Sequence, residues 1–299
     1  MKPLQTVIIG GRESRHGAQA LAETTRLLER RGIAVAESHL VKDRAALRKG
    51  VRRFVKSGRK LIVVCGGDGA QTTACEEMAH SDSVLAVIPG GTGNSFAQTL
   101  GVPHDDIEGA VDVICNGRSE RIDLGYVNKR YFANFSTIGL TAEVGANTPH
   151  WLKQIFGAFA YAIGAAPLLA TEPPFRVRIS TEKRTYKLKT YQIVVANGRY
   201  FGSQPLTPDA EPTDGELALF TTTGLSRAAL VRMYFAVVAG TQTQLPDALY
   251  FNAKRIEIKT RRRLLVSIDG DPGGYTPATF RVARRALRVM VPQSFPLRG

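Results

Sequence analysis

Short apolar runs alternate with amphipathic segments over roughly the first 118 residues. Each apolar run has the length of a buried strand, and the segments between them repeat their apolar positions at helical spacing. The predicted strands cover residues 6–9, 33–37, 61–65 and 84–88, and the predicted helices cover 18–31, part of 42–60, a segment from 70, 94–100 and 105–116. Strict alternation of strands and helices predicts an α/β domain, a parallel sheet with helices on its faces.

The pattern changes after about residue 120, where many short strands follow one another at regular spacing. Such spacing is typical of an antiparallel β-sandwich. The predicted strands cover 126–127, 131–135, 175–180, 185–195, 216–220, 255–259, 264–268 and 279–282, with helices over 151–166 and 225–239. The longest apolar stretch, 155–170, is short for a membrane span and is broken by glycines and Pro167, so we expect no transmembrane helix. The segment 151–170 fits either a buried helix or a membrane-contacting wall.

Two glycine-rich turns follow predicted strands and precede predicted helices. The first is Cys65-Gly66-Gly67-Asp68-Gly69 and the second is Pro89-Gly90-Gly91-Thr92-Gly93-Asn94. Such turns leave backbone N–H groups and a helix N-terminus open to a phosphate, and a side chain would block close approach. Either turn alone fits an ordinary connection in a parallel sheet. Together, with Asp68 and Asn94 as polar groups, they predict a nucleotide site for ATP.

The composition indicates the redox compartment and the number of domains. The three cysteines, Cys65, Cys75 and Cys115, form no metal-binding spacing, and the five histidines are scattered. These features favour a reducing, cytoplasmic compartment, and the residues before the first strand do not read as a signal peptide. The 299 residues are enough for two domains.

The net charge of +14 is concentrated in part at residues 42–60, which hold nine basic side chains. These side chains fit either a solvated helix face or a surface for an anionic partner. An acidic membrane surface is the favoured partner, giving peripheral membrane association. Nucleic acid is not expected, because no binding motif or basic–aromatic interleaving is present.

Three motifs resemble the diacylglycerol kinase catalytic family, which includes sphingosine kinases and bacterial soluble lipid kinases. They are Gly66-Gly67-Asp68-Gly69, the segment from Pro89 to Ala97, and Ile268-Asp269-Gly270-Asp271. The resemblance implies an NAD-kinase- or phosphofructokinase-like nucleotide-binding domain over 1–120, a β-sandwich lipid-substrate domain over 121–286, and an active site in the cleft between them. It implies also that a last strand within 287–299 returns to the first domain. The implied reaction moves the γ-phosphoryl group of ATP to a lipid hydroxyl with Mg²⁺, which demands positioning, charge neutralisation and a base.

The resemblance also assigns roles to residues. Asp271 is the expected catalytic base, and Asp68, near the phosphates and Mg²⁺, is a second candidate. Asp269 is the third expected catalytic residue, as the polar or Mg²⁺-side companion of Asp271. A structural Mg²⁺ would be held by the Asp214 side chain and by carbonyl oxygens of Glu211 and Glu216, against the alternative of a solvated acidic loop. The residues expected to bind nucleotide are Gly66, Gly67, Asp68, Gly69, Gly91, Thr92, Gly93 and Asn94.

Four departures from the family pattern weaken the expectation of activity. Ala70 replaces a threonine, Ser95 an aspartate and Asp271 a glutamate, and residues 10–14 keep only the small residues of the usual N-terminal loop. An NAD kinase shares Gly-Gly-Asp-Gly and stays an alternative, as does a non-catalytic nucleotide- or lipid-binding relative. The sequence does not name the lipid or fix the oligomeric state, and a homodimer stays open.

Overall fold

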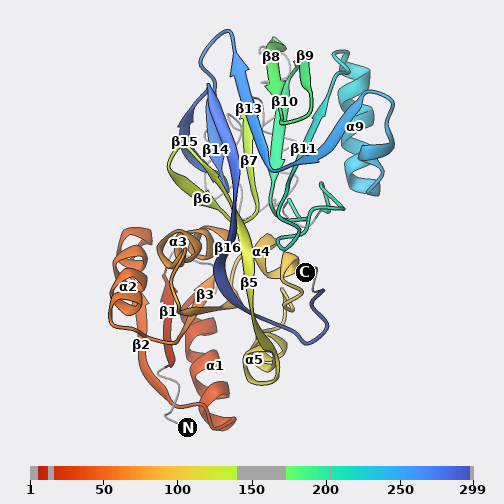
Figure 1. The fold of residues 1–299 in the computed structure, drawn as a ribbon. Helices are drawn as coiled ribbons and strands as arrows, with labels where there is room; N and C mark the ends of the chain where they lie inside the picture. The colour runs from red at the N-terminus through yellow and green to blue at the C-terminus, as the bar shows by residue number, and fades with distance from the viewer. Residues whose placement is uncertain (1–5, 13–16, 140–172, 202–203, 297–299) are drawn as a thin grey trace. The chain divides into compact units, whose positions relative to one another are not determined.

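The computed structural model describes residues 6–12, 17–139, 173–201 and 204–296 (Figure 1). The chain divides into two units, which we treat separately. Unit 1 comprises Met1–Leu124 with Arg284–Gly299, and unit 2 comprises Gly125–Ala283. From the sequence, these limits are expected at 120/121 and 286/287.

Unit 1 is built on a sheet whose strands run in the order β2-β1-β3-β4-β16, with parallel pairing between each neighbouring pair. The strands β1 and β3 are buried almost throughout, as expected for a sheet covered on both faces. Its elements are β1 (Thr6–Gly11), α1 (Gly17–Arg30), β2 (Val35–Val41), α2 (Arg44–Lys56), β3 (Leu61–Gly66), α3 (Asp68–Met78), β4 (Val84–Pro89), α4 (Ser95–Thr99) and α5 (Ile107–Asn116).

The helix α2 shows how the local sequence fixes an element of unit 1. The side chain of Asp43 accepts a hydrogen bond from the N–H of Ala46 at 2.8 Å and so caps the first turn. Its apolar face, Leu47, Val51 and Phe54, is buried at helical spacing. That packing brings α2 against α3, and α1 packs against α5 in the same unit.

Unit 2 is a sandwich of two sheets, which confirms the predicted α/β plus β-sandwich fold class. One sheet has the order β16-β13-β8-β9, with β5 and β6 attached, and the other has the order β12-β11-β10-β7-β14-β15. A core of buried apolar side chains, including Ile179, Ile256, Val195 and Leu219, joins their inner faces. The elements are β5 (Arg118–Val127), β6 (Arg130–Phe132), β7 (Phe135–Gly139), β8 (Phe175–Ser180), β9 (Thr185–Thr190), β10 (Gln192–Ala196), β11 (Leu217–Thr222), α9 (Arg227–Ala239), the short 3₁₀ helix η1 (Gln242–Gln244), β12 (Ala248–Ala253), β13 (Arg255–Thr260), β14 (Leu265–Ile268), β15 (Asp271–Tyr275) and β16 (Ala278–Val291).

The helix α9 covers the outer face of the six-stranded sheet. Its Met233 packs with Val194 of β10 and Phe220 of β11, side chains that alternate with the inner-face residues of the same strands. Its opposite side exposes Val231, Phe235 and Val238. No helix in the described part of the chain is long and apolar enough to cross a membrane.

Three strand predictions were wrong in detail. Residues 185–195 form two strands, because Tyr191 separates β9, which pairs with β8, from β10, which pairs with β7 and β11 in the other sheet. The separate strands expected at 279–282 and at the end of the chain are one long strand, β16. The strand β12 was missed, although it pairs with β11 along its whole length. The helix predicted over 151–166 lies outside the described residues.

Candidate active site

The two glycine turns lie against each other in unit 1. The first joins β3 to α3 and the second joins β4 to α4, and the N–H of Gly90 donates to the carbonyl of Gly66 at 3.1 Å. A Cβ atom added to Gly91 would come within 2.6 Å of the Gly67 Cα atom, and one added to Gly67 would come within 2.9 Å of the Gly91 Cα atom. Both glycines are therefore required by the close approach of two backbones.

We expect Gly91→Ala to destabilise the protein by about 1–3 kcal/mol, because the new methyl group meets backbone that must shift. Thermal or denaturant unfolding measures the loss. The matched control is Gly69→Ala, where the nearest atom to a new Cβ is Arg44 Cζ at an ordinary 3.7 Å. Equal stability of the two variants would contradict the steric argument.

The side-chain amides of Gln71, Asn94 and Gln98 hold these turns in shape, and of the three only Asn94 is predicted from the motifs. Gln71 donates to the carbonyls of Val64 and Gly66 at 2.9 and 3.2 Å. Gln98 donates to the carbonyl of Gly93 at 2.7 Å. The motifs do not predict these roles, because only the folded chain brings each amide within reach of the carbonyl that it binds.

Asn94 is predicted to bind nucleotide, and in the structure its side chain also forms hydrogen bonds within the second turn. Its Oδ1 accepts from the N–H of Gly91 at 2.9 Å, and its Nδ2 donates to the carbonyls of Gly91 and His104 at 2.9 and 2.8 Å. Its backbone is left-handed, with φ of 47°, a conformation that asparagine tolerates. Asn94 therefore shapes the second turn from within.

Asp68 connects the two turns directly. Its Oδ1 accepts from the N–H of Phe96 at 3.1 Å, and its Oδ2 accepts from the Ser95 hydroxyl at 3.3 Å. The carboxylate thus caps α4, whose own cap residue Asn94 makes no capping bond from its side chain. Burial raises the pKa of Asp68, and the bonds from Phe96 and Ser95 oppose that rise. A carboxylate held in this way is costly to ionise, which is characteristic of functional acids.

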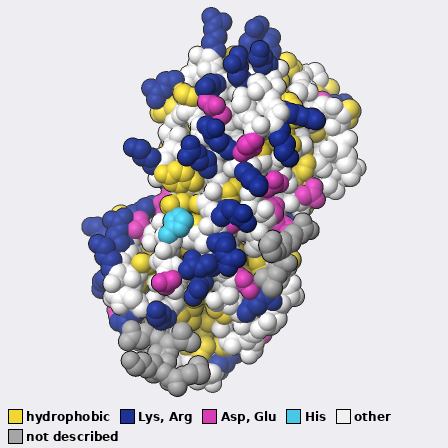
Figure 2. Space-filling view, in the orientation of Figure 1, with side chains coloured by type: hydrophobic (Ala, Val, Ile, Leu, Met, Phe, Trp, Pro, Cys, Tyr) yellow, Lys and Arg dark blue, Asp and Glu magenta, His cyan; other side chains and the backbone are white. Residues whose placement is uncertain are grey.

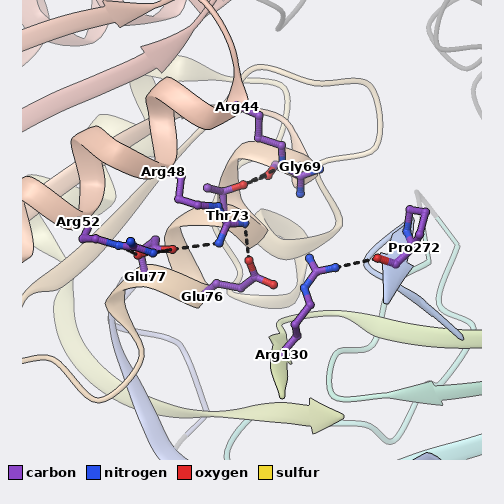
Figure 3. A network of polar contacts seen from close by, with 9 residues as sticks. All are labelled: Arg44, Arg48, Arg52, Gly69, Thr73, Glu76, Glu77, Arg130 and Pro272. Carbon is purple, nitrogen blue, oxygen red and sulfur yellow. Dashed lines mark hydrogen bonds and ion pairs between the residues drawn. The ribbon is translucent and has the colours of Figure 1, made fainter. Parts of the chain in front are cut away.

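A cation from another helix lies beside the first turn. Arg44, the first residue of α2, donates through Nε to the Thr73 hydroxyl at 2.8 Å, and that hydroxyl donates to the carbonyl of Gly69 at 2.9 Å (Figure 3). In the sequence, Arg44 is one of the nine basic side chains at residues 42–60 and carries no other signal. Its place at the first turn depends on the packing of α2 against α3, which the sequence pattern alone does not reveal.

The other arginines of the basic helix are engaged by acidic side chains. Arg52 forms a two-bond pair with Glu77, with Nε–Oε2 and NH2–Oε1 distances of 2.7 and 3.0 Å, and Arg48 bridges Glu76 and Glu77 at 2.6 and 2.9 Å (Figure 3). Arg53 pairs with Glu37. The carboxylates of Glu37, Glu76 and Glu77 therefore offset part of the positive charge that the sequence pattern assigns to an anionic partner.

In unit 2, Asp269 joins two loops. Its Oδ2 accepts from the N–H of Ala133 at 2.9 Å, and its Oδ1 accepts from the N–H groups of Asn134 and Phe135 at 3.0 and 2.9 Å. Asp269 and Gly270 both have positive φ, 45° and 90°, and form the two-residue turn between β14 and β15. The turn is therefore a hairpin whose first side chain fixes the loop before β7.

Asp269→Ala should destabilise unit 2 by about 3 kcal/mol or more. The backbone N–H groups of Ala133, Asn134 and Phe135 would lose their acceptor, and each unsatisfied N–H group costs about 1–3 kcal/mol. Chemical denaturation followed by fluorescence would measure this. The control Asp269→Asn keeps one acceptor oxygen for Asn134 and Phe135 and should lose less. A wild-type unfolding curve for Asp269→Ala would refute this role.

Asp271 stands at the other side of the same turn. It begins β15 and pairs in register with Ile268. The next residue, Pro272, presents its carbonyl to the Arg130 guanidinium at 2.9 Å (Figure 3). Asp271 is thus half-buried at the start of a hairpin strand, and Arg130 binds the carbonyl of the residue that follows it, while the oxygens of Asp269 accept backbone N–H groups.

Two buried asparagines near this hairpin were not predicted. Asn134 lies 1% exposed beside the Asp269 contacts, and its carbonyl accepts the N–H groups of Asn197 and Gly198 at 2.8 and 3.0 Å. Asn197, also 1% exposed, donates from Nδ2 to the carbonyl of Ala133 at 3.1 Å. A lone asparagine within an apolar strand run was the available signal for each.

The acidic loop predicted to hold a structural Mg²⁺ forms one tight turn in unit 2. The Asp214 side chain accepts from the N–H of Glu216 at 2.8 Å, the N–H of Asp214 donates to the carbonyl of Glu211, and Glu211 pairs with Arg199 at 3.4 Å. Burial raises the pKa of Tyr250 to about 12, and the charges of Asp209 and Asp214 add to the rise. Among the described residues no three acidic, histidine or cysteine side chains form a metal-binding group, so a cation here would need backbone carbonyls in addition to the Asp214 side chain.

Comparisons with known proteins agree with this geometry. Residues 7–127 match the diacylglycerol kinase catalytic domain, and residues 136–291 match the YegS C-terminal NAD kinase beta sandwich-like domain. The diacylglycerol kinase of Staphylococcus epidermidis is 31% identical over 244 residues, covering 81% of this chain and 77% of that protein. That of Staphylococcus aureus is 32% identical over 243 residues, covering 80% and 77%.

Solved structures share the fold. A diacylglycerol kinase from Bacillus anthracis superposes with a TM-score of 0.75 at 22% identity, covering 99% of this chain and all of that one. A second Bacillus anthracis structure has a TM-score of 0.85 at 24% identity, covering 99% and 98%.

The site is that of a kinase with an alcohol acceptor. Its features are the paired glycine turns, the buried carboxylate of Asp68 and the sandwich that follows in the chain. The chain belongs to the diacylglycerol kinase family, and the resemblance inferred from its three motifs is confirmed.

Proposed function

We propose that this protein is an ATP-dependent lipid kinase that transfers the γ-phosphoryl group to the hydroxyl of a diacylglycerol-like lipid. The observation that carries the proposal is the Asp68 carboxylate, which lies between two glycine turns whose backbones approach too closely for side chains. That arrangement offers backbone N–H groups for phosphate oxygens and a carboxylate for the accompanying cation.

The proposed nucleotide site uses the first turn of α3. The cap residue Gly67 has no side chain, so the first N–H groups of α3 face a phosphate without obstruction. Arg44 brings a guanidinium to Gly69, and such a cation stabilises phosphate oxygens. Ala70 lacks the hydroxyl that the family pattern has at this position, and we propose that Arg44 offsets part of that loss.

We propose Mg²⁺ as the cofactor held near Asp68, where it would neutralise charge on the phosphates. Asp68 fits this role because its carboxylate is fixed by Phe96 and Ser95. The acidic loop of Asp214 is a second candidate for Mg²⁺, through its side chain and the carbonyls of Glu211 and Glu216. Oxygen-only ligands are those that a hard cation prefers.

We propose that Asp271 accepts the proton of the lipid hydroxyl. Asp269 is the less suitable base, because three backbone N–H groups already use its oxygens. The glycine turns of unit 1 and Asp271 of unit 2 would then serve a single reaction. We propose also that the protein works in the cytoplasm and reaches its lipid at the membrane surface.

An assay of γ-phosphate transfer from labelled ATP to lipids in mixed micelles tests the proposal. The lipid panel should include diacylglycerol, monoacylglycerol, a sphingoid base and phosphatidylglycerol, with NAD as a separate acceptor. We expect one class of lipid to be labelled. Labelling of NAD alone would establish an NAD kinase instead, and ATP binding without any product would indicate a non-catalytic relative.

A further inference from the structure

The two outer faces of the unit 2 sandwich differ in chemistry. The face of the six-stranded sheet is covered by α9, as described above. The outer face of β9, β8, β13 and β16 is covered by no helix in the described part of the chain and carries the side chains that alternate with the core residues. On β8, for example, Val177 and Ile179 enter the core while Arg176 and Arg178 are exposed.

This outer face is strongly basic. Each of its four strands contributes at least one exposed Lys or Arg, and its one acidic side chain, Glu257, pairs with Lys259 at 2.7 Å. Figure 2 shows many Lys and Arg side chains over the region where Figure 1 places β8, β9 and β13. We call this set the basic sheet face: Arg176, Arg178, Lys187, Lys189, Arg255, Lys259 and Arg281.

The strand register sets like charges directly opposite one another. Arg178 lies between Lys187 on β9 and Lys259 on β13. Arg176 lies opposite Lys189, and Arg255 and Arg281 form a further opposed pair. Like charges in these positions destabilise a sheet, so a face with four such pairs is costly to the folded protein unless an anionic partner neutralises it.

The basic helix of unit 1 is the weaker candidate for the same partner. Arg48, Arg52 and Arg53 are held in ion pairs with Glu76, Glu77 and Glu37. On the basic sheet face, by contrast, the pair of Glu257 with Lys259 is the one ion pair among the described residues, and the charge of Arg255 acts on the same Glu257, so a single carboxylate faces all seven cations.

We propose that the basic sheet face docks the protein on an anionic lipid bilayer. The proposal rests on the proposed function in one respect, since a kinase whose acceptor is a lipid works at such a surface. Four adjacent strands spaced by about 4.8 Å span about 15 Å, enough to meet several lipid head groups at once. The aromatic ring of β9, Tyr186, stacks on Phe251 toward the core, so the face lacks the exposed aromatic platforms of single-strand nucleic-acid binders.

Vesicle co-sedimentation of the full chain without nucleotide tests this docking. The vesicles are phosphatidylcholine alone, or equal parts phosphatidylcholine and phosphatidylglycerol. The test variant combines Arg178→Gln, Lys187→Gln and Lys189→Gln. Three charges near a membrane should weaken binding to the anionic vesicles by about 100-fold. The matched control, Lys49→Gln, Lys56→Gln and Lys60→Gln, removes three exposed charges from unit 1 and should bind as the wild type does.

Several outcomes would overturn the proposal: equal binding to neutral vesicles, a larger loss in the control than in the test variant, or wild-type binding to duplex DNA but not to anionic vesicles. If the triple variant fails to fold, the three single variants replace it, each with a loss of about fivefold. Because binding needs no turnover, a protein that docks through this face but labels no lipid would refute the kinase proposal alone. A protein that labels a lipid, but binds anionic vesicles equally well with and without the three glutamine substitutions, would refute the docking proposal alone.

Discussion

Asp68→Asn should lower the phosphoryl-transfer rate by about 100-fold or more and, at the same time, make the protein more stable at neutral pH. The amide keeps an oxygen for the N–H of Phe96 and offers an N–H to the Ser95 hydroxyl, so the cap of α4 survives. It cannot carry the negative charge that a cation and phosphates require, and electrostatic groups of this kind contribute about 100- to 1,000-fold.

The stability gain follows from the direction of the pKa shift. Folding raises the pKa of Asp68, so the folded protein disfavours the charged form. Stability from this group is fully present below its ordinary pKa, about 4, and is lost as the pH rises through the folded value. The asparagine variant does not titrate, so its advantage should grow from acidic to neutral pH.

Thermal unfolding midpoints of both proteins across that pH range check the second half of this prediction. Gly69→Ala provides a control in the same turn that leaves the carboxylate in place. A variant less stable than the wild type at neutral pH would mean that Asp68 is a structural ion rather than a strained functional acid.

Asp271→Asn should abolish most turnover without changing the unfolding curve. Removal of a general base costs about 100- to 10,000-fold in rate. The hairpin of β14 and β15 should keep its fold, because its turn is formed by Asp269 and Gly270 and the asparagine has the size and shape of the aspartate. We expect the Michaelis constant for ATP to change little.

Asp271→Glu separates the chemistry of this position from its packing. A glutamate, which the family pattern has here, restores a base with one more methylene and should keep turnover within about tenfold of the wild type. Steady-state rates of both variants on the lipid labelled by the wild type make the comparison. Unchanged turnover in Asp271→Asn would move the role of base to Asp68.

The glycine turns could be predicted from the sequence because their requirements are local. Gly67 and Gly91 follow apolar strands and precede helices, and any parallel sheet brings such turns to one edge. The same holds for the hairpin between β5 and β6, where Asn128 and Lys129, with positive φ values of 48° and 66°, lie in the gap between the strands predicted at 126–127 and 131–135.

What the sequence did not reveal depends on contacts between distant segments. The oxygens of Asp269 accept N–H groups from residues about 135 positions earlier, and no local pattern marks such a pairing. Arg44 reads as one more charge on a basic helix until α2 is packed against α3. The division of 185–195 at Tyr191 was missed because each half alone fits a strand, and only pairing assigns them to different sheets.

The long strand β16 has a consequence for the order of events during synthesis. Its last residues, among them Leu287 and Val289, are buried in unit 1, and it pairs there with β4 through Arg288 and Val289. These residues leave the ribosome only after the whole of unit 2 has been made. Until then the nascent nucleotide-binding unit exposes β4 as an open edge, the kind of surface that invites wrong pairing. We therefore expect unit 1 to complete its sheet only after unit 2 has been synthesised. We expect chaperones to bind the open edge of β4 until then.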